Sequence, residues 1–153
     1  MRFVLKTVMV LGLAGFALTA GAGEKRYTAS NAKWQAECSS CHIAYPPQLL
    51  PAVSWQRILG GLDRHFGTDA SMEAKATEEI GAFLAANAAR GKRAQRAGNQ
   101  IRITETPWFR HEHDEVAPAV WKSPKVKSAA NCAACHLGAE SGDYSEHNVR
   151  MPR

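Results

Sequence analysis

The chain has 153 residues, of which 45% are hydrophobic, and carries a net charge of +5. This length fits one or two small domains. Two of the positive residues, Arg2 and Lys6, fall in a segment that we expect to be removed. The remaining charge is too small to indicate a nucleic-acid-binding protein, and no nucleic-acid partner is predicted.

Residues 1–22 have the pattern of a Sec-type signal peptide. Arg2 and Lys6 precede an apolar run from Thr7 to Leu18, and small residues follow up to Ala22. Cleavage after Ala22 is expected, with Ala20 as the alternative. The apolar run is short for a membrane span. An uncleaved membrane anchor is the alternative interpretation. The signal predicts a periplasmic protein in an oxidising compartment.

The first motif of the mature chain is a Cys-x-x-Cys-His run at Cys38, Cys41 and His42. This spacing is typical of c-type haem attachment, in which two sulfurs bond the porphyrin and the histidine ligates the iron. We expect a short helix from Trp34 to Cys41 to present the motif. The prolines that follow predict an extended loop; they are Pro46, Pro47 and Pro51.

Two helices are predicted after this loop. The first starts with Ser54 as its N-cap and ends at Gly67, with apolar residues at helical spacing and His65 at the edge of that face. Its apolar residues are Trp55, Ile58, Leu59, Leu62 and Phe66. The second starts at Asp69 or Ser71. Its buried stripe is expected to be Met72, Ala76, Ile80, Phe83 and Leu84.

A basic stretch between Arg90 and Arg102 follows the second helix. We interpret it as a solvated linker and helix end; the alternative is a docking patch for an acidic redox partner. The domain boundary is placed here, which divides the chain into residues 23–98 and 99–153.

The C-terminal part contains one predicted helix and a second haem motif. Thr106 and Pro107 form a helix start, and the helix should turn Trp108, Phe109 and Val116 inward and stop before Pro118. The second Cys-x-x-Cys-His run lies at Cys132, Cys135 and His136, followed by an irregular tail. The two porphyrins should supply much of the core of so small a protein, so we expect the apoprotein to fold poorly.

Each iron needs a sixth ligand opposite His42 or His136. His65 is preferred for the first haem, with Met72 as its rival. For the second haem, His113 lies nearer the apolar face of its helix than His111 does, so His113 is preferred. His147 and Met151 are weaker candidates. Two histidine ligands saturate the iron and give a lower reduction potential than a His/Met pair.

Three functions are compatible with these motifs. An electron carrier needs two saturated irons and is favoured. A haem enzyme or gas sensor would need a labile distal ligand, and the chain shows no catalytic constellation beyond its histidines. A zinc protein would have to join two distant cysteine pairs, which is unlike common zinc motifs.

Several specific runs make the chain resemble the dihaem cytochrome c family (the DHC type) of bacterial periplasmic electron carriers. These runs are Glu37 to Pro47, Leu49 to Pro51, Ser54-Trp55, His65 to Gly67, Trp108-Phe109, His113, Glu115, Ser128 to His136 and Ala139 to Gly142.

The resemblance implies a mainly α fold with two haem domains. The N-terminal domain would be similar to class I cytochromes c, and the C-terminal domain would be smaller and less regular. It also implies two covalently attached haem c groups, with His65 and His113 as distal ligands. The implied electron acceptor is an oxygen-binding monohaem cytochrome similar to the sphaeroides haem protein. An upstream donor, such as a membrane cytochrome, would supply the electrons.

Overall fold

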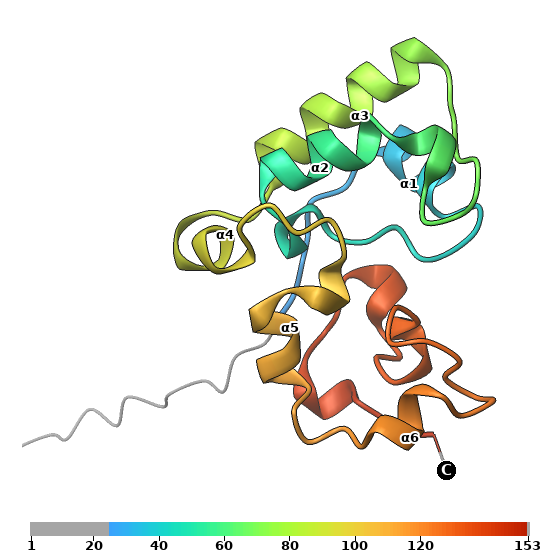
Figure 1. The fold of residues 1–153 in the computed structure, drawn as a ribbon, viewed down its shortest axis with the longest axis vertical. Helices are drawn as coiled ribbons and strands as arrows, with labels where there is room; N and C mark the ends of the chain where they lie inside the picture. Colours follow the sequence, from blue (N-terminus) through green and yellow to red (C-terminus); the bar gives the residue numbers. More distant parts are fainter. Residues whose placement is uncertain (1–24, 153) are drawn as a thin grey trace, which may run out of the picture.

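The computed structural model describes residues 25–152, so the predicted signal peptide lies outside the described residues. Within this range the regular elements are helices, and extended backbone pairs only in isolated bridges (Figure 1). This confirms the predicted mainly α fold. No helix among residues 25–152 has the length and apolar character needed to cross a bilayer.

Three helices build the N-terminal part: α1 (Ala32–Cys38), α2 (Ala52–Leu59) and α3 (Ala74–Asn87). α2 lies along α3, and α1 also packs against α3 (Figure 1). Their apolar faces meet in one core, because each helix carries its large apolar residues on one side. The core residues are Trp34, Leu50, Trp55, Ile80, Leu84 and Ala88.

α2 begins and ends earlier than predicted. Pro51 stands at its N-cap position, and Ser54 is buried inside the helix. The helix ends at Leu59 because Gly60 and Gly61 follow directly, and glycines favour the end of a helix. The apolar spacing continues to Phe66, but only a 3-10 turn, Leu62–Arg64, forms there.

α3 starts three residues after Ser71 rather than at Asp69 or Ser71. The Asp69 carboxylate instead accepts a hydrogen bond from the backbone N–H of Ser71 (2.9 Å), which forms a turn before the helix. The predicted stripe is confirmed as the inward face: three of its residues are buried, and Met72 and Phe83 pack against the core.

The basic stretch predicted as a linker contains a helix, α4 (Gly91–Ala97), which contacts α5 (Pro107–Glu112). The start of α5 is as predicted, because the Thr106 hydroxyl accepts a hydrogen bond from the N–H of Phe109 (3.3 Å). α5 ends at Glu112, well before Pro118, and Pro118 begins the separate short helix α6 (Pro118–Trp121).

Short 3-10 turns make up most of the remaining C-terminal part, as the prediction of an irregular domain implied. They are Cys132–Ala134, Ala139–Ser141 and Glu146–Asn148. The N-terminal segment crosses to this part of the molecule: the N–H of Tyr27 donates to the Gly142 carbonyl (2.9 Å), and the N–H of Tyr144 donates to the Lys25 carbonyl (2.9 Å). The boundary after residue 98 stays a prediction.

A buried carboxylate organises these turns. Asp143 accepts hydrogen bonds from the Ser145 backbone and hydroxyl (3.0 and 2.6 Å) and from the Asn148 side chain (2.6 Å). It also pairs with Arg26 at 3.1 Å. Because a buried carboxylate needs such partners to offset its desolvation, Asp143 ties the N-terminal segment to the C-terminal turns.

Candidate functional site

The first cysteine pair lies at the end of α1. The Asn31 side chain caps this helix by accepting the N–H of Trp34 (2.8 Å), and the buried Trp34 fixes it to the core. α1 ends at Cys38 rather than at Cys41, so Cys38 is half-buried and Cys41 is exposed on the following turn.

His42 follows, and its imidazole is held by the backbone of the next residue. Nδ1 lies 2.7 Å from the Ile43 carbonyl oxygen, which can only accept, so Nδ1 carries the proton. Nε2 therefore carries the lone pair that can bind a metal. A carbonyl that fixes the tautomer in this way is the usual partner of a metal-bound histidine.

The ring of His65 faces His42. Their ring centroids are 6.2 Å apart and their planes meet at 27°. His65 occupies the C-cap of the 3-10 turn, and a tight turn follows it, in which Phe66 (φ 52°) and Gly67 (φ 101°) have left-handed backbone. Burial, His42 and Arg102 lower the pKa of His65, which favours the neutral ring that can bind a metal.

The ring of Phe66 lies beside His65, with centroids 4.7 Å apart. Its side chain is 44% exposed, and the Arg102 guanidinium lies over its ring at 4.2 Å. This cation–π contact covers one face of the Phe66 ring.

The second motif repeats the arrangement on different elements. Cys132 begins a 3-10 turn, and the N–H of His136 donates to the Cys132 carbonyl (2.8 Å). His113, at the C-cap of α5, faces His136 with ring centroids 6.1 Å apart and planes at 74°. Its Nδ1 lies 2.9 Å from the Phe109 carbonyl oxygen. The carbonyl again fixes the tautomer that leaves Nε2 available.

Aromatic rings enclose this second pair. Phe109 stacks on His113 (4.1 Å, 20°), and Trp121 on α6 and Tyr144 in the tail lie beside the two histidines. Burial, with a smaller contribution from His113, lowers the pKa of His136 and keeps it neutral. Neither Trp121 nor Tyr144 was predicted from the sequence to lie at the site. The signal for Trp121 was its position three residues after Pro118, a residue type that often begins a helix.

The spacing of each histidine pair fits an iron between the two rings. An imidazole nitrogen binds a metal at about 2 Å, so two rings on opposite sides of one ion have centroids about 6 Å apart. The observed 6.2 and 6.1 Å match this value. The structure therefore brings together His42 with His65 and His136 with His113, as local pairing predicts.

The cysteines and acids do not form a site for a bare metal ion. No cluster of three or more His, Cys, Asp or Glu side chains suited to a metal occurs within residues 25–152. None of the four cysteines forms a disulfide. Burial, with a contribution from Glu37, raises the pKa of Cys38 to about 11, and burial raises that of Cys132 to about 11 as well. Without haem the two thiols would therefore stay neutral, and no zinc ligand set occurs within residues 25–152.

The rival ligands lie elsewhere. Met72 packs against the N-terminal core. The side chain of His111 is 77% exposed and faces Asp114, which confirms that His113 is the inward histidine of the two. His147 is exposed, and Met151 is 48% exposed.

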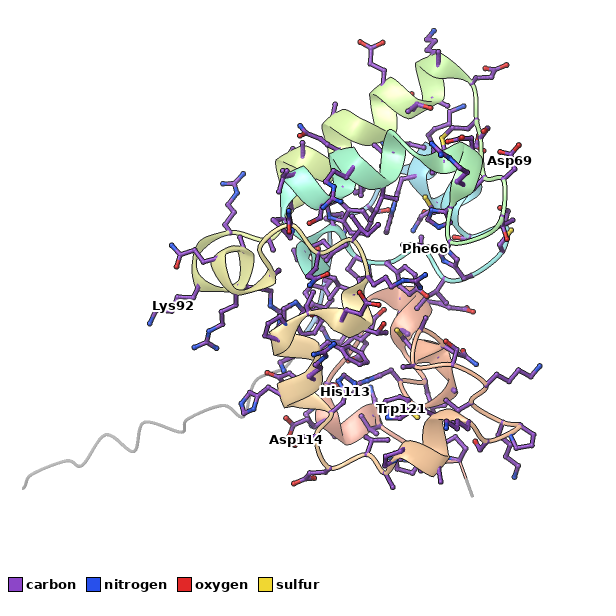
Figure 2. The ribbon with its side chains drawn as sticks, viewed as in Figure 1. Phe66, Asp69, Lys92, His113, Asp114 and Trp121 are labelled. Carbon is purple, nitrogen blue, oxygen red and sulfur yellow. The ribbon has the colours of Figure 1, made fainter. Side chains whose placement is uncertain are left out.

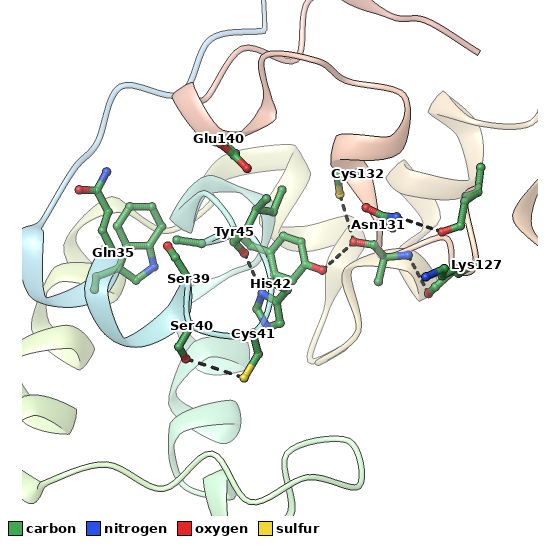
Figure 3. Close-up of a pocket in the computed structure, with 16 residues that line it drawn as sticks. Gln35, Ser39, Ser40, Cys41, His42, Tyr45, Lys127, Asn131, Cys132 and Glu140 are labelled. Atoms are coloured by element: carbon green, nitrogen blue, oxygen red, sulfur yellow. Dashed lines mark hydrogen bonds between the residues drawn. The ribbon is translucent and has the colours of Figure 1, made fainter. Parts of the chain in front are cut away.

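A cavity of about 840 Å³ separates the two motifs (Figure 3). Its lining includes Cys41 and His42 from the first motif and Asn131 and Cys132 from the second. Its size lies within the range of cofactor-binding pockets. Residues of both motifs thus line a shared space, with the helical region above and the irregular region below (Figures 1 and 2).

Comparisons with known proteins agree with this geometry. The family model for dihaem cytochrome c matches residues 34–144. The chain is similar to the diheme cytochrome c of Rhodobacter sphaeroides, with 42% identity and a TM-score of 0.69 over 77% of this chain and 99% of that one.

It is also similar to the diheme cytochrome c of Shewanella baltica, with 39% identity and a TM-score of 0.70 over 80% of this chain and 93% of that one. A search of curated proteins gave no match.

Proposed function

Since this chain belongs to the dihaem cytochrome c family and carries two covalently attached haem c groups, we propose that it is a periplasmic electron carrier. The family implies electron transfer. The proposed location rests on the signal-peptide pattern of residues 1–22.

We assign the haem attachments and ligands as follows. Cys38 and Cys41 hold the first haem, and Cys132 and Cys135 hold the second. The axial ligands are His42 and His65 in the first site and His136 and His113 in the second. The observation that carries this assignment is the spacing of about 6 Å within each histidine pair. When bound, each haem supplies a one-electron couple between ferric and ferrous iron.

Two histidines leave no open coordination position for a substrate. Backbone carbonyls hold His42 and His113 in place, and aromatic rings pack beside His113 and His136. These features favour electron transfer over catalysis, and reduction potentials below those of His/Met cytochromes c.

The test is the absorption spectrum of the reduced protein with and without carbon monoxide. We expect no change, because both irons are saturated. His65→Ala and His113→Ala should each make one haem, and only one, bind carbon monoxide. A shift in the unmodified protein would overturn the carrier proposal and favour a haem enzyme or gas sensor.

For the electron acceptor, we propose an oxygen-binding monohaem cytochrome similar to the sphaeroides haem protein, with a membrane cytochrome as a possible class of donor. Support for a charged docking surface comes from α4 and its surroundings. Arg90, Lys92 and Arg96 lie on or at the start of this helix, and Arg57 reaches the adjacent Asn99 carbonyl. None of these cations forms an ion pair within residues 25–152.

This basic surface lies next to the second haem site. α4 contacts α5, which carries His113 at its end, and the Arg93 guanidinium lies 4.4 Å from the Trp108 ring centre. An acidic face on the partner would therefore be steered toward the C-terminal haem.

Docking can be tested by the rate at which the reduced protein reduces a purified sphaeroides haem protein at increasing salt. Lys92→Glu with Arg96→Glu should slow the reaction several-fold at low salt and flatten its salt dependence. The control is Lys33→Glu with Lys75→Glu, which changes net charge equally on α1 and α3. Equal effects of the two double variants would exclude α4 as the docking surface.

A further inference from the structure

Tyr45 contacts both haem motifs. Its ring stacks on His42, with centroids 4.6 Å apart and planes at 23°. Its hydroxyl donates a hydrogen bond to the Ala130 carbonyl oxygen at 2.7 Å (Figure 3). Ala130 lies two residues before Cys132, so one side chain joins the iron-ligating histidine of the first site to the cysteine turn of the second.

The acceptor of this hydrogen bond is itself held firmly. The Ser128 hydroxyl accepts the N–H of Ala130 (3.1 Å), and the Asn131 amide donates to the Val126 carbonyl (3.1 Å). Val126 is fully buried. These hydrogen bonds hold the loop from Val126 to Cys132 in one conformation. The Ala130 carbonyl therefore has a defined position in which it accepts the hydrogen bond from Tyr45.

Of the three tyrosines in the chain, Tyr45 is the one whose hydroxyl group joins the two motifs. Tyr45 lines the cavity between the motifs. The Tyr27 hydroxyl accepts a hydrogen bond from Arg93 (2.8 Å), and the Tyr144 hydroxyl is buried without a partner. A carbonyl oxygen can only accept, so the Tyr45 hydroxyl is the donor in its hydrogen bond to Ala130.

We propose that Tyr45 is the positioning residue for electron transfer between the two haems: its ring fixes His42, and its hydroxyl fixes the loop that leads into Cys132. This proposal deepens the carrier function and rests on it. The step is the transfer of one electron between the two sites, which oxidises one iron and reduces the other. No bond forms or breaks, and the tyrosine proton stays on its oxygen.

The test variant is Tyr45→Phe in the holoprotein, which keeps the ring and removes only the hydrogen bond to Ala130. Pulse radiolysis delivers one electron per molecule, and transient absorption then follows its redistribution between the haems. We expect the redistribution to slow several-fold. The electron paramagnetic resonance spectrum of each haem should be unchanged, because the axial histidines stay in place.

Tyr27→Phe is the matched control, because it removes a tyrosine hydroxyl that does not join the motifs. It should leave the redistribution rate at the wild-type value. The proposal is overturned if Tyr45→Phe redistributes electrons at the wild-type rate, or if Tyr27→Phe slows the process equally. Tyr45→Leu, which also removes the ring, should slow it at least as much as Tyr45→Phe.

Failure of this proposal is distinguishable from failure of the carrier function. Carbon monoxide binding to the unmodified protein would count against the carrier function. A wild-type redistribution rate in Tyr45→Phe, with both irons still insensitive to carbon monoxide, would count only against Tyr45.

Discussion

The two haem regions build the same pair of facing histidines on different supports. In the N-terminal region, α1, α2 and α3 enclose a protein core of two tryptophans and several aliphatic residues. In the C-terminal region, the buried apolar side chains are few and scattered, namely Phe109, Val126 and Ala139. Hydrogen bonds to Asp143 and the crossing N-terminal segment take the place of a core there. The comparison indicates that the second region depends more on its haem for folding.

The largest expected effect comes from removing one haem attachment at a time. In Cys132→Ala with Cys135→Ala, haem content should fall by half, and residues 107–152 should lose amide protection, because little apolar core remains without the porphyrin. In Cys38→Ala with Cys41→Ala, haem content should fall equally while α2 and α3 stay protected. Hydrogen exchange with mass spectrometry, together with a haem assay, measures both.

Equal loss of protection in the two double variants would contradict the comparison. It would mean that the helical core also fails without its haem.

An intermediate effect is expected at Gly142, where the N-terminal segment crosses the irregular region. Its φ of 77° is left-handed, and a Cβ there would lie 2.1 Å from the Tyr27 carbonyl oxygen. Gly142→Ala should therefore lower the free energy of unfolding by about 1–3 kcal/mol, measured by denaturant titration. Gly91→Ala is the control, because it has a similar φ of 57° with no atom within 4 Å of the added Cβ. A matching loss in Gly91→Ala would show that backbone conformation alone causes the effect.

The smallest effect is a pH dependence centred on Asp143. Hydrogen bonds from Ser145, with smaller contributions from Asn148 and Arg26, lower its pKa from 3.8 to about 2. A lowered pKa contributes stability above the unfolded value, and this contribution disappears as the pH falls from about 4 to about 2. Asp143→Asn should reduce the thermal midpoint at neutral pH and show a smaller further loss in that acid range.

The control for this prediction is Glu140→Gln, which removes an exposed carboxylate nearby. Its acid unfolding profile should follow that of the wild type. If Asp143→Asn also follows the wild-type profile, the contacts of Asp143 with Arg26, Ser145 and Asn148 do not contribute measurably to the free energy of unfolding.

The haem motifs and the choice of His113 over His111 could be predicted because they depend on local spacing and on one helix face. The end of α2 could not be predicted as readily, since apolar spacing continued past Gly60 and Gly61. α4 was missed because its charged residues resemble a solvated linker, and its contact with α5 comes from Arg93 and Trp108. The link from Tyr45 to Ala130 spans 85 residues, and no local pattern encodes it.

The histidine pairs also differ in the angle between their rings, which is 27° for His42 and His65 and 74° for His113 and His136. If these histidines ligate the haem irons as proposed, nearly parallel rings would donate into the same iron d orbital and separate it in energy from its neighbour. Nearly perpendicular rings would donate into both orbitals equally and leave them close in energy. The ferric N-terminal haem should therefore give a rhombic magnetic resonance spectrum and the C-terminal haem a strongly anisotropic one. Reduction of either ferric iron removes its own magnetic resonance signal, so the signal that is lost shows which haem an electron has reached.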